Sequence, residues 1–269
     1  MRVAIIILLI VLNSCQKIKY YEDKELEVFA PQKIVHRGGE SQFHLENTLD
    51  GIKRSLREFD GVEVDVQMSK DESIWLSHSV DVYQCKTKLN CFPEMKDSDI
   101  RAVLSCNGVD FSYTNLEDVF KYMKDSFPNK PICIDMKGWV PCSVNSMDIE
   151  GMLRREGELI VILAQKYGLA KNLLFETETT SVLDYLNSKK SGAGIYLTSY
   201  GDFERAVLIA LKQKYSGISF KTNIGEKISK DKIDLLHRKG LKIIVWNLLS
   251  SDEIAYYESI GVDYIQFDL

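Results

Sequence analysis

A small set of residues in the first third of the chain has the types and the spacing that metal-assisted acid–base chemistry requires. His36 and Arg37 follow a short apolar run, Glu63 and Asp65 alternate with apolar residues in a second run, and His78 ends a third. Residues two apart on a β-strand point to the same face, so the two carboxylates lie side by side. Imidazole titrates near neutral pH and can therefore accept or donate a proton beside them.

A third carboxylate completes the pattern of a metal site. Asp135 lies in the apolar segment 131–137 and can join Glu63 and Asp65 on the inner face of a sheet. Three convergent carboxylates repel one another unless a cation lies between them, and oxygen-only ligands favour Mg²⁺, Ca²⁺ or Mn²⁺ over zinc. The sequence therefore predicts a divalent-cation site at these three residues.

These side chains need a frame that brings distant segments together. Apolar runs bounded by turn residues predict strands at 33–36, 61–68, 131–137, 172–176, 194–198, 217–221, 242–247 and 263–267. Segments with helical periodicity lie between them at 48–59, 115–125, 148–167, 180–189, 203–214, 229–238 and 251–260. This alternation predicts an α/β fold, a (β/α)8 TIM barrel with a parallel sheet, and such barrels carry their sites at the carboxyl ends of the strands.

One apolar segment does not fit the barrel repeat. Residues 73–78 follow the second strand too closely for a helical crossover, so we expect an antiparallel hairpin arm. A turn centred on Asp71 and Glu72 would set Asp65 opposite His78; because Glu72 is poorly suited to a tight primed turn, a wider loop with a shifted register is the alternative. The following residues, 79–112, are predicted to be irregular, and because a long loop in a compact domain usually has a function, we expect a lid or substrate rim there.

Composition limits the number of domains and the partners. The chain has 269 residues, of which 45% are hydrophobic and 27% charged, which suits one barrel domain over residues 31–269. The net charge of −5 gives no broad basic surface, so nucleic acid is not an expected partner.

The N-terminus has the pattern of a targeting segment. Met1 and Arg2 precede an apolar stretch, 3–12, that is too short to span a membrane, and a small residue leads into Cys15. This pattern resembles a bacterial lipoprotein signal, which implies a signal peptide at 1–14, lipidation of Cys15, a tether at 15–30, and export to the bacterial cell envelope as a membrane-anchored lipoprotein. A short signal anchor and an ordinary signal peptide are the alternatives.

Export would favour a disulfide over a zinc site for the remaining cysteines, and no pair of them has the Cys-x-x-Cys spacing of a zinc site. We expect Cys85 to pair with Cys91, with Cys106 as an alternative partner for either of them. Cys142 has no assigned partner. Cys133 lies in an apolar strand and is the best candidate for a buried free thiol.

The order His36-Arg37-Gly38, Glu46-Asn47-Thr48, Glu63-x-Asp65 and then a strand ending in His78 resembles the glycerophosphodiester phosphodiesterase family. The resemblance implies the same barrel fold and hydrolysis of a small-molecule glycerophosphodiester to an alcohol and sn-glycerol 3-phosphate. The reaction would run through attack by the neighbouring glycerol hydroxyl, giving a cyclic phosphate that water opens, or through direct attack by water. The resemblance also places Glu46 beside the metal, Trp246 against the glycerol carbons and a small insertion over the barrel mouth at 79–112. A tryptophan of the core is the alternative for Trp246.

Hydrolysis of a phosphodiester gives the polar residues specific roles. His36 and His78 form a candidate acid and base pair, because the nucleophile needs a base and the leaving alkoxide an acid. Arg37 offers a planar fork for phosphate oxygens or an anchor for carboxylates, whereas Lys137 supplies a point charge. Lys221, at the end of a later strand, is a weaker candidate for a phosphate contact. We expect His44 and His237 to be structural or solvent-exposed.

The chain departs from the family pattern at four places. Asp135 stands where the family usually has Glu, His44-Leu45 replaces Ala-Pro, Ser79 replaces an aspartate after His78, and residues 267–269 end without the usual Thr-Asp-x-Pro. Two other functions therefore stay open. One is a related barrel phosphodiesterase acting on another phosphodiester, phospholipase-D-like or inositol-lipid-cleaving; the other is a lipid-anchored binding protein without turnover.

Overall fold

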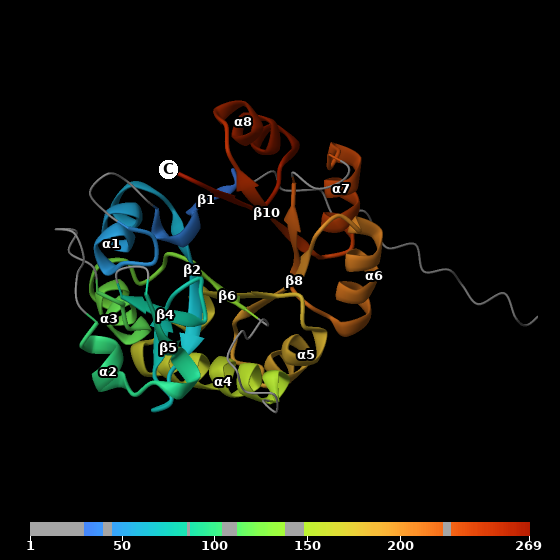
Figure 1. Cartoon of the computed structure of the whole chain (residues 1–269). Coiled ribbons are helices and arrows are strands. Elements are labelled where there is room, and N and C mark those ends of the chain that lie inside the picture. Colours follow the sequence, from blue (N-terminus) through green and yellow to red (C-terminus); the bar gives the residue numbers. More distant parts are fainter. Residues whose placement is uncertain (1–29, 40–44, 85–86, 104–111, 138–147, 223–226) are drawn as a thin grey trace, which may run out of the picture.

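The computed structural model describes residues 30–39, 45–84, 87–103, 112–137, 148–222 and 227–269 (Figure 1). Several predictions fall outside these ranges, namely those for the signal peptide, Cys15, nearly all of the tether, His44, Cys85, Cys106 and Cys142.

Eight parallel strands close into a barrel. They are β1 (Gln32–Val35), β2 (Gly61–Met68), β6 (Ile132–Met136), β7 (Leu173–Thr177), β8 (Gly194–Ser199), β9 (Gly217–Lys221), β10 (Lys242–Leu248) and β11 (Tyr264–Phe267). The order around the barrel is β1-β11-β10-β9-β8-β7-β6-β2, and pairing of β1 with β2 closes it. The predicted (β/α)8 fold is confirmed, and each predicted strand agrees with the structure to within one residue at either end.

Helices cover the outside of the barrel (Figure 1). They are α1 (Leu49–Glu58), α3 (Leu116–Ser126), α4 (Ile149–Tyr167), α5 (Thr180–Ser188), α6 (Phe203–Gln213), α7 (Lys230–Arg238) and α8 (Ser251–Ile260). Most begin at a side-chain cap that satisfies a free backbone N–H, as where Thr48 accepts from Gly51 N. All seven predicted helices are confirmed. A short 3₁₀ helix, η4 (Ala170–Asn172), joins α4 to β7.

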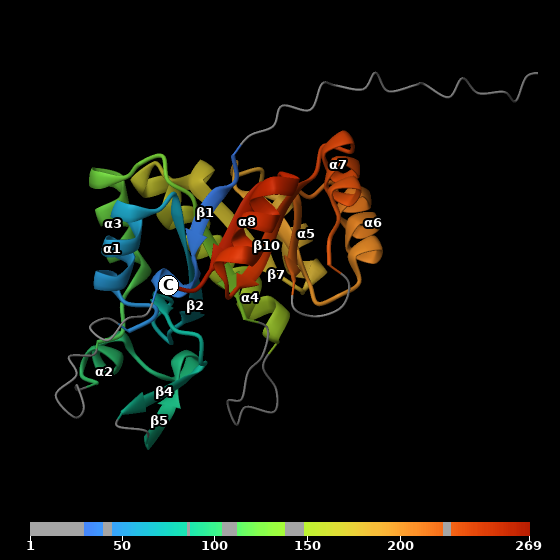
Figure 2. The ribbon, with the colours of Figure 1, turned by 90° about the horizontal axis from the view of Figure 1, so that it is seen from above.

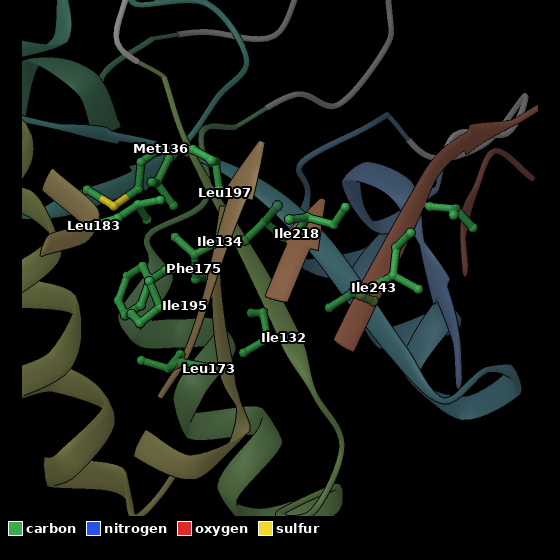
Figure 3. Close-up of a cluster of buried hydrophobic side chains, with 14 of the residues drawn as sticks. Ile132, Ile134, Met136, Leu173, Phe175, Leu183, Ile195, Leu197, Ile218 and Ile243 are labelled. Atoms are coloured by element: carbon green, nitrogen blue, oxygen red, sulfur yellow. The ribbon is translucent and has the colours of Figure 1, made fainter. Parts of the chain in front are cut away.

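Alternation along each strand separates two layers of side chains. On β6, Ile132, Ile134 and Met136 point outward and pack under the helices in the main core (Figure 3). The intervening residues point into the barrel. The floor of the interior is apolar and consists of Ile34, Cys133, Leu174, Tyr196, Ile244 and Tyr264. Polar residues occupy the next inward positions toward the carboxyl ends of the strands.

The expected hairpin arm is present, but its predicted register is wrong. β3 (Ile74–Leu76) runs antiparallel to β2 and pairs Val66 with Leu76. Ser77 N donates to Asp65 O at 3.1 Å, so Ser77 and not His78 lies opposite Asp65. The loop is one residue wider than a tight turn, since Ser69 N bonds Ser73 O and Glu72 adopts a positive φ of 62°. A side chain at that φ is tolerated in a three-residue loop, which shifts the register by one.

The insertion is more ordered than predicted. Instead of an irregular segment, its described part contains β4 (Asp81–Gln84), β5 (Thr87–Cys91), η3 (Phe92–Glu94) and α2 (Asp97–Arg101). It has its own small core, formed by Trp75, Val82, Phe92, Met95, Ile100 and Val103. Asp97 fixes it to the hairpin by accepting hydrogen bonds from Ser69, Ser73 and Trp75 Nε1. The β4–β5 hairpin extends beyond the barrel (Figure 2).

Two cysteines fall within the described residues. Cys133 is buried and free, as predicted. Cys91 is disulfide-bonded. Its partner lies outside the described residues, so the pairing with Cys85 or Cys106 stays a prediction. Among the helices of the described segments, none has the length and apolar character that crossing a membrane requires.

Candidate active site

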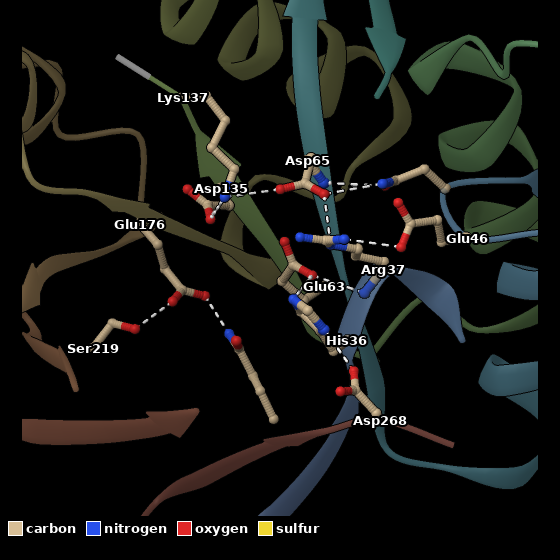
Figure 4. A network of polar contacts seen from close by, with 12 residues as sticks. His36, Arg37, Glu46, Glu63, Asp65, Asp135, Lys137, Glu176, Ser219 and Asp268 are labelled. Carbon is tan, nitrogen blue, oxygen red and sulfur yellow. Dashed lines mark hydrogen bonds and ion pairs between the residues drawn. The ribbon is translucent and has the colours of Figure 1, made fainter. Parts of the chain in front are cut away.

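A cavity of about 510 Å³ lies at the carboxyl ends of the barrel strands. Glu63, Asp65 and Asp135 converge on one side of it, with one oxygen from each carboxylate within 4.8 Å of the others. Asp65 and Asp135 are register partners on β2 and β6, and Glu63 is on the same face of β2. The structure therefore brings together the three predicted metal ligands (Figure 4).

The three carboxylates fit a hard divalent cation. Glu63 is 2% exposed and its Oε1 has no hydrogen-bond partner among the described residues. Burial and the neighbouring charge of Asp65 raise the pKa of Glu63 to about 8, and burial also raises the pKa of Asp135. The raised pKa values mean that the charged forms of Glu63 and Asp135 are unfavourable in this environment. A cation between the carboxylates would stabilise the charged forms and bind the unpartnered oxygen of Glu63.

Two cations hold the cluster together. Lys137 Nζ lies 2.9 Å from Asp65 Oδ1 and also contacts Asp135. Burial would lower the pKa of Lys137, but the charges of Asp135, Asp65 and Glu63 outweigh it and raise the pKa. Arg37 Nε lies 3.1 Å from Asp65 Oδ2. Because burial of Asp65 is opposed by Lys137 and Arg37, the pKa of Asp65 falls below its ordinary value.

Arg37 has a positioning role in this geometry. It lies in the 3₁₀ turn η2 (His36–Gly38) with a left-handed φ of 52°, and the next residue, Gly38, has a φ of 70°. A Cβ on Gly38 would lie 2.6 Å from Ile52 Cγ1, so the turn requires glycine there. The turn directs Arg37 N to Glu63 Oε2 at 2.8 Å. Of its two predicted roles, the described contacts support the one in which Arg37 orients carboxylates.

The Glu-Asn-Thr segment acts through its asparagine. Asn47 Nδ2 donates to Asp65 Oδ2 at 2.9 Å, and Asp65 N donates to Asn47 Oδ1 at 3.1 Å. Glu46, predicted as a metal ligand, is absent from the converging group and instead accepts from Arg37 Nη1 at 2.9 Å. Asn47 is part of the Glu-Asn-Thr motif, but its two hydrogen bonds with Asp65 could be identified only from the structure.

His36 is oriented by a residue at the other end of the chain. Its Nδ1 is 2.7 Å from Asp268 Oδ1, and its Nε2 is 3.9 Å from Glu63 Oε2. Burial alone would lower the pKa of His36, but the hydrogen bond to Asp268 and the charge of Glu63 raise it above its ordinary value. Asp268 directly follows the last barrel strand, and no sequence motif predicted its contact with His36.

His78 lies beyond the end of β3 and lines the same cavity. Burial is the largest influence on it and, with the charges of Arg37 and Lys137, lowers the pKa of His78 despite the charge of Asp65. The two predicted catalytic histidines are thus brought to one cavity, and their pKa values shift in opposite directions. His237 instead pairs with Asp263 at 2.9 Å on the outside of the barrel, which is the structural role predicted for it.

The cavity has a second wall, formed by later strands. Lys221 and Trp246, both predicted to contact substrate, lie there. The cavity also contains a buried polar cluster that was not predicted, in which Glu176 accepts hydrogen bonds from Ser219 Oγ and Gln266 Nε2 (Figure 4). No described residue of the insertion lines the cavity, so its predicted lid role stays a prediction.

Comparison with known proteins agrees with this geometry. The model of the glycerophosphoryl diester phosphodiesterase family matches residues 36–269. A glycerophosphodiester phosphodiesterase from Parabacteroides distasonis has a similar structure, with a TM-score of 0.70, 18% identity, and coverage of 89% of this chain and 93% of that one. An enzyme of the same description from Thermotoga maritima gives a TM-score of 0.64 and 22% identity, covering 88% of this chain and 94% of that one.

A phosphodiesterase from Oleispira antarctica, solved in complex with the product sn-glycerol-3-phosphate, gives a TM-score of 0.70 at 14% identity. The alignment covers 89% of this chain and 93% of that one. These identities are low, so the structural likenesses support the fold alone. No match was found among curated protein sequences.

Proposed function

Since the chain belongs to the glycerophosphoryl diester phosphodiesterase family and is a phosphodiesterase, we propose that it hydrolyses glycerophosphodiesters to an alcohol and sn-glycerol 3-phosphate with a divalent cation. The observation that carries the proposal is the convergence of Glu63, Asp65 and Asp135 in a cavity that two histidines share. The product bound to the Oleispira antarctica enzyme supports the choice of product.

Glu63, Asp65 and Asp135 would hold the cation. When bound, such an ion supplies positive charge for a phosphoryl oxygen and lowers the pKa of a hydroxyl group next to it. Lys137, on the same strand face as Asp135, then offers a point charge to a second phosphoryl oxygen. Arg37 and Asn47 hold the carboxylates in place.

The different surroundings of the histidines support different roles for them. Because Asp268 and Glu63 favour the protonated form of His36, it is suited to deliver a proton to the leaving alkoxide. His78 has a lowered pKa and is suited to take the proton from the attacking hydroxyl. This pair serves attack by a glycerol hydroxyl and attack by water equally well.

A release assay tests the proposal. The protein would be incubated with glycerophosphocholine, glycerophosphoethanolamine, glycerophosphoinositol and intact phospholipid, and sn-glycerol 3-phosphate would be measured. We expect release from at least one of the three small diesters, loss of release in excess chelator, and recovery with Mg²⁺, Ca²⁺ or Mn²⁺. Asp135→Asn should abolish release, whereas Asp125→Asn, on the exposed side of α3, should not change it. Full activity in excess chelator would contradict the metal site.

We also propose that the enzyme is exported and anchored in the bacterial cell envelope through Cys15. The support is the short apolar stretch 3–12 followed by a small residue and cysteine. These residues lie outside the described part of the chain.

A further inference from the structure

One end of the barrel carries a cluster of lysines that the proposed reaction does not use. Strands β7, β8, β9 and β10 are neighbours in the barrel, and because they are parallel, their first residues lie at the same end. The basic face consists of the exposed lysines at or just before these first residues, namely Lys171, Lys190, Lys214, Lys239 and Lys242. No aspartate or glutamate occurs in the segments that lead into the four strands, 168–172, 189–193, 214–216 and 239–241.

Contacts between the neighbouring loops keep the basic face together. The Cγ of Lys171 lies 3.4 Å from the position that a Cβ on Gly192 would occupy. Ser216 links the next loops, since its Oγ accepts from Ile195 N at 3.0 Å and its carbonyl oxygen accepts from Lys242 N at 2.9 Å. Within the described segments, none of the lysines of the basic face forms an ion pair. Their charges are therefore available to a partner.

Two of these lysines lie where the backbone favours glycine. Lys190 and Lys214 have φ values of 49° and 58° at the ends of α5 and α6. At the corresponding ends of α4, α7 and α8 the residues with positive φ are Gly168, Gly240 and Gly261. A side chain in this conformation costs energy that glycine avoids. A cation also favours a helix C-terminus, but Lys189 and Lys212 already provide one at these two ends. Helix capping therefore does not explain Lys190 and Lys214.

The opposite end of the barrel has the opposite charge. Most helices begin there, at the end where the cavity lies, and several have acidic residues in their first turn: Asp50, Glu150, Glu204, Asp252 and Glu253. The net charge of the chain is −5, so the basic face is a local feature. A negatively charged surface would attract this end of the barrel and repel the other.

The described chain enters the barrel at the basic end. β1 begins at Gln32 and is parallel to the other barrel strands, so its start lies at the same end as the basic face (Figure 2). Residues 15–30, proposed above to connect the barrel to a lipid, join the described chain at this end.

We propose that the basic face docks on anionic phospholipid head groups of the bilayer that holds the anchor, so that the cavity faces away from the membrane. The inference rests on the proposed anchor for the identity of the membrane and is independent of the proposed reaction. Each lysine near an anionic bilayer strengthens binding about fivefold. Because salt screens these charges, the basic face orients an anchored protein and does not hold it in the membrane fraction by itself.

Vesicle sedimentation tests the attraction. The Cys15→Ser protein, which cannot carry the lipid, would be mixed with vesicles of phosphatidylcholine alone or with about 30% phosphatidylglycerol. The readout is the ratio of the two affinities, since any contribution of the apolar stretch 3–12 is common to both vesicles. We expect a preference of at least about tenfold for the anionic vesicles at low salt, and no preference in about 0.5 M salt.

Two double variants separate membrane docking from fold stability. Lys190→Gly combined with Lys214→Gly removes two charges from the basic face and two side chains from left-handed backbone. The preference for anionic vesicles should fall about fivefold, while the unfolding temperature should not decrease. Lys70→Gln combined with Lys96→Gln is the matched control with the same change of charge, because both lysines are exposed at the cavity end. It should leave the preference unchanged.

Amine labelling of the anchored protein tests the orientation. In vesicles that contain phosphatidylglycerol, an amine-reactive reagent should modify the lysines of the basic face several-fold less than in phosphatidylcholine vesicles. Lys70 and Lys96 should be modified equally in both. Mass spectrometry of the peptides measures the modification of each lysine.

The outcomes distinguish this inference from the proposed reaction. Equal binding to both kinds of vesicle, an unchanged preference in the double glycine variant, or protection of Lys70 and Lys96 in place of the basic face would overturn docking and leave the phosphodiesterase reaction standing. Retention by duplex DNA without a preference for anionic vesicles would also overturn it. A preference for anionic vesicles in a protein that releases no sn-glycerol 3-phosphate would support docking and overturn the reaction.

Discussion

His36 and His78 line the same cavity, but the charges around them shift their pKa values in opposite directions. We expect the loss of either side chain to lower turnover. Replacing either one with alanine removes a proton-transfer group, so kcat should fall by roughly 10² to 10⁴ while the fold is retained. His237→Ala is the matched control, because His237 pairs with Asp263 outside the barrel, and turnover should stay normal. Near-normal turnover in His36→Ala or His78→Ala would reject the assignment.

Asp268 acts through His36 and is therefore a positioning residue. Asp268→Asn removes the charge that raises the pKa of His36 but keeps a hydrogen-bonding oxygen. If His36 donates a proton, activity is lost as pH rises through its pKa, so the alkaline limb of the pH profile should move to lower pH. We expect kcat to fall about tenfold at neutral pH. A reduced kcat with an unchanged pH profile would indicate a purely structural role.

The sequence predicted the residues whose spacing is local and missed those whose partners are distant. Glu63 and Asp65 are two apart on one strand, so their common face follows from the period of a strand. Asp268 reaches His36 only because β11 pairs with β1. Glu176 could have been predicted from the sequence, because a charged residue at an inward-facing position of a barrel strand indicates a residue of the cavity.

Helix α4 carries a buried carboxyl group that the proposed reaction does not use. Glu156 is 1% exposed, and the backbone N–H of Met68 donates to it. Burial raises the pKa of Glu156 to about 8. Between about pH 4.5 and 8 the folded protein therefore keeps the proton of Glu156, whereas the unfolded chain has released it. The free energy of unfolding falls over this range by ~1.4 kcal/mol per pH unit because of this group.

Glu156→Gln should remove this penalty. The amide keeps an oxygen for Met68 N and cannot ionise, so the variant should unfold at a higher temperature than the wild type at pH 8.5 and gain little at pH 4.5. Thermal unfolding at both pH values measures the difference. Glu158→Gln, on the exposed side of the same helix, is the control; the pKa of Glu158 is lowered by Lys189 and Arg155, so this variant should show no gain at pH 8.5. A gain equal at both pH values would contradict the ionisation argument.

Helix and strand positions were largely predictable, whereas the hairpin register and the insertion were not. A barrel strand can be recognised in the sequence because it is a short apolar run with turn residues on both sides. The β2–β3 register depends on whether Glu72 adopts a positive φ. A residue with a side chain does so only where the rest of the loop offsets the steric strain, and the sequence alone does not show this. The insertion was predicted to be irregular because its core residues are few and lie far apart in the sequence, from Val82 to Val103.

The start of the first barrel strand and the cavity lie at opposite ends of the barrel. β1 begins at Gln32 at the amino-terminal end of the barrel, while the cavity lies at the carboxyl ends of the strands. Figure 2 shows the start of β1 and the β4–β5 hairpin at opposite ends of the molecule. We propose that a lipid on Cys15 leaves the cavity open to water, because the described chain enters the barrel at the end away from the cavity and residues 15–30, if extended, would reach roughly 50 Å.

We therefore predict an anchored enzyme that acts on water-soluble diesters. Mass spectrometry of the mature N-terminal peptide from native membranes should find Cys15 as the first residue, carrying the multiple acyl chains that stable anchoring requires. Cys15→Ser should move the protein out of the membrane fraction, and its kcat/KM on a soluble glycerophosphodiester should match that of the wild type, because the described chain enters the barrel at the end away from the cavity. Cleavage at another residue, or an unmodified Cys15, would contradict the anchor. Faster cleavage of intact phospholipid in vesicles than of the soluble diester would contradict the orientation, since it requires the cavity to face the bilayer.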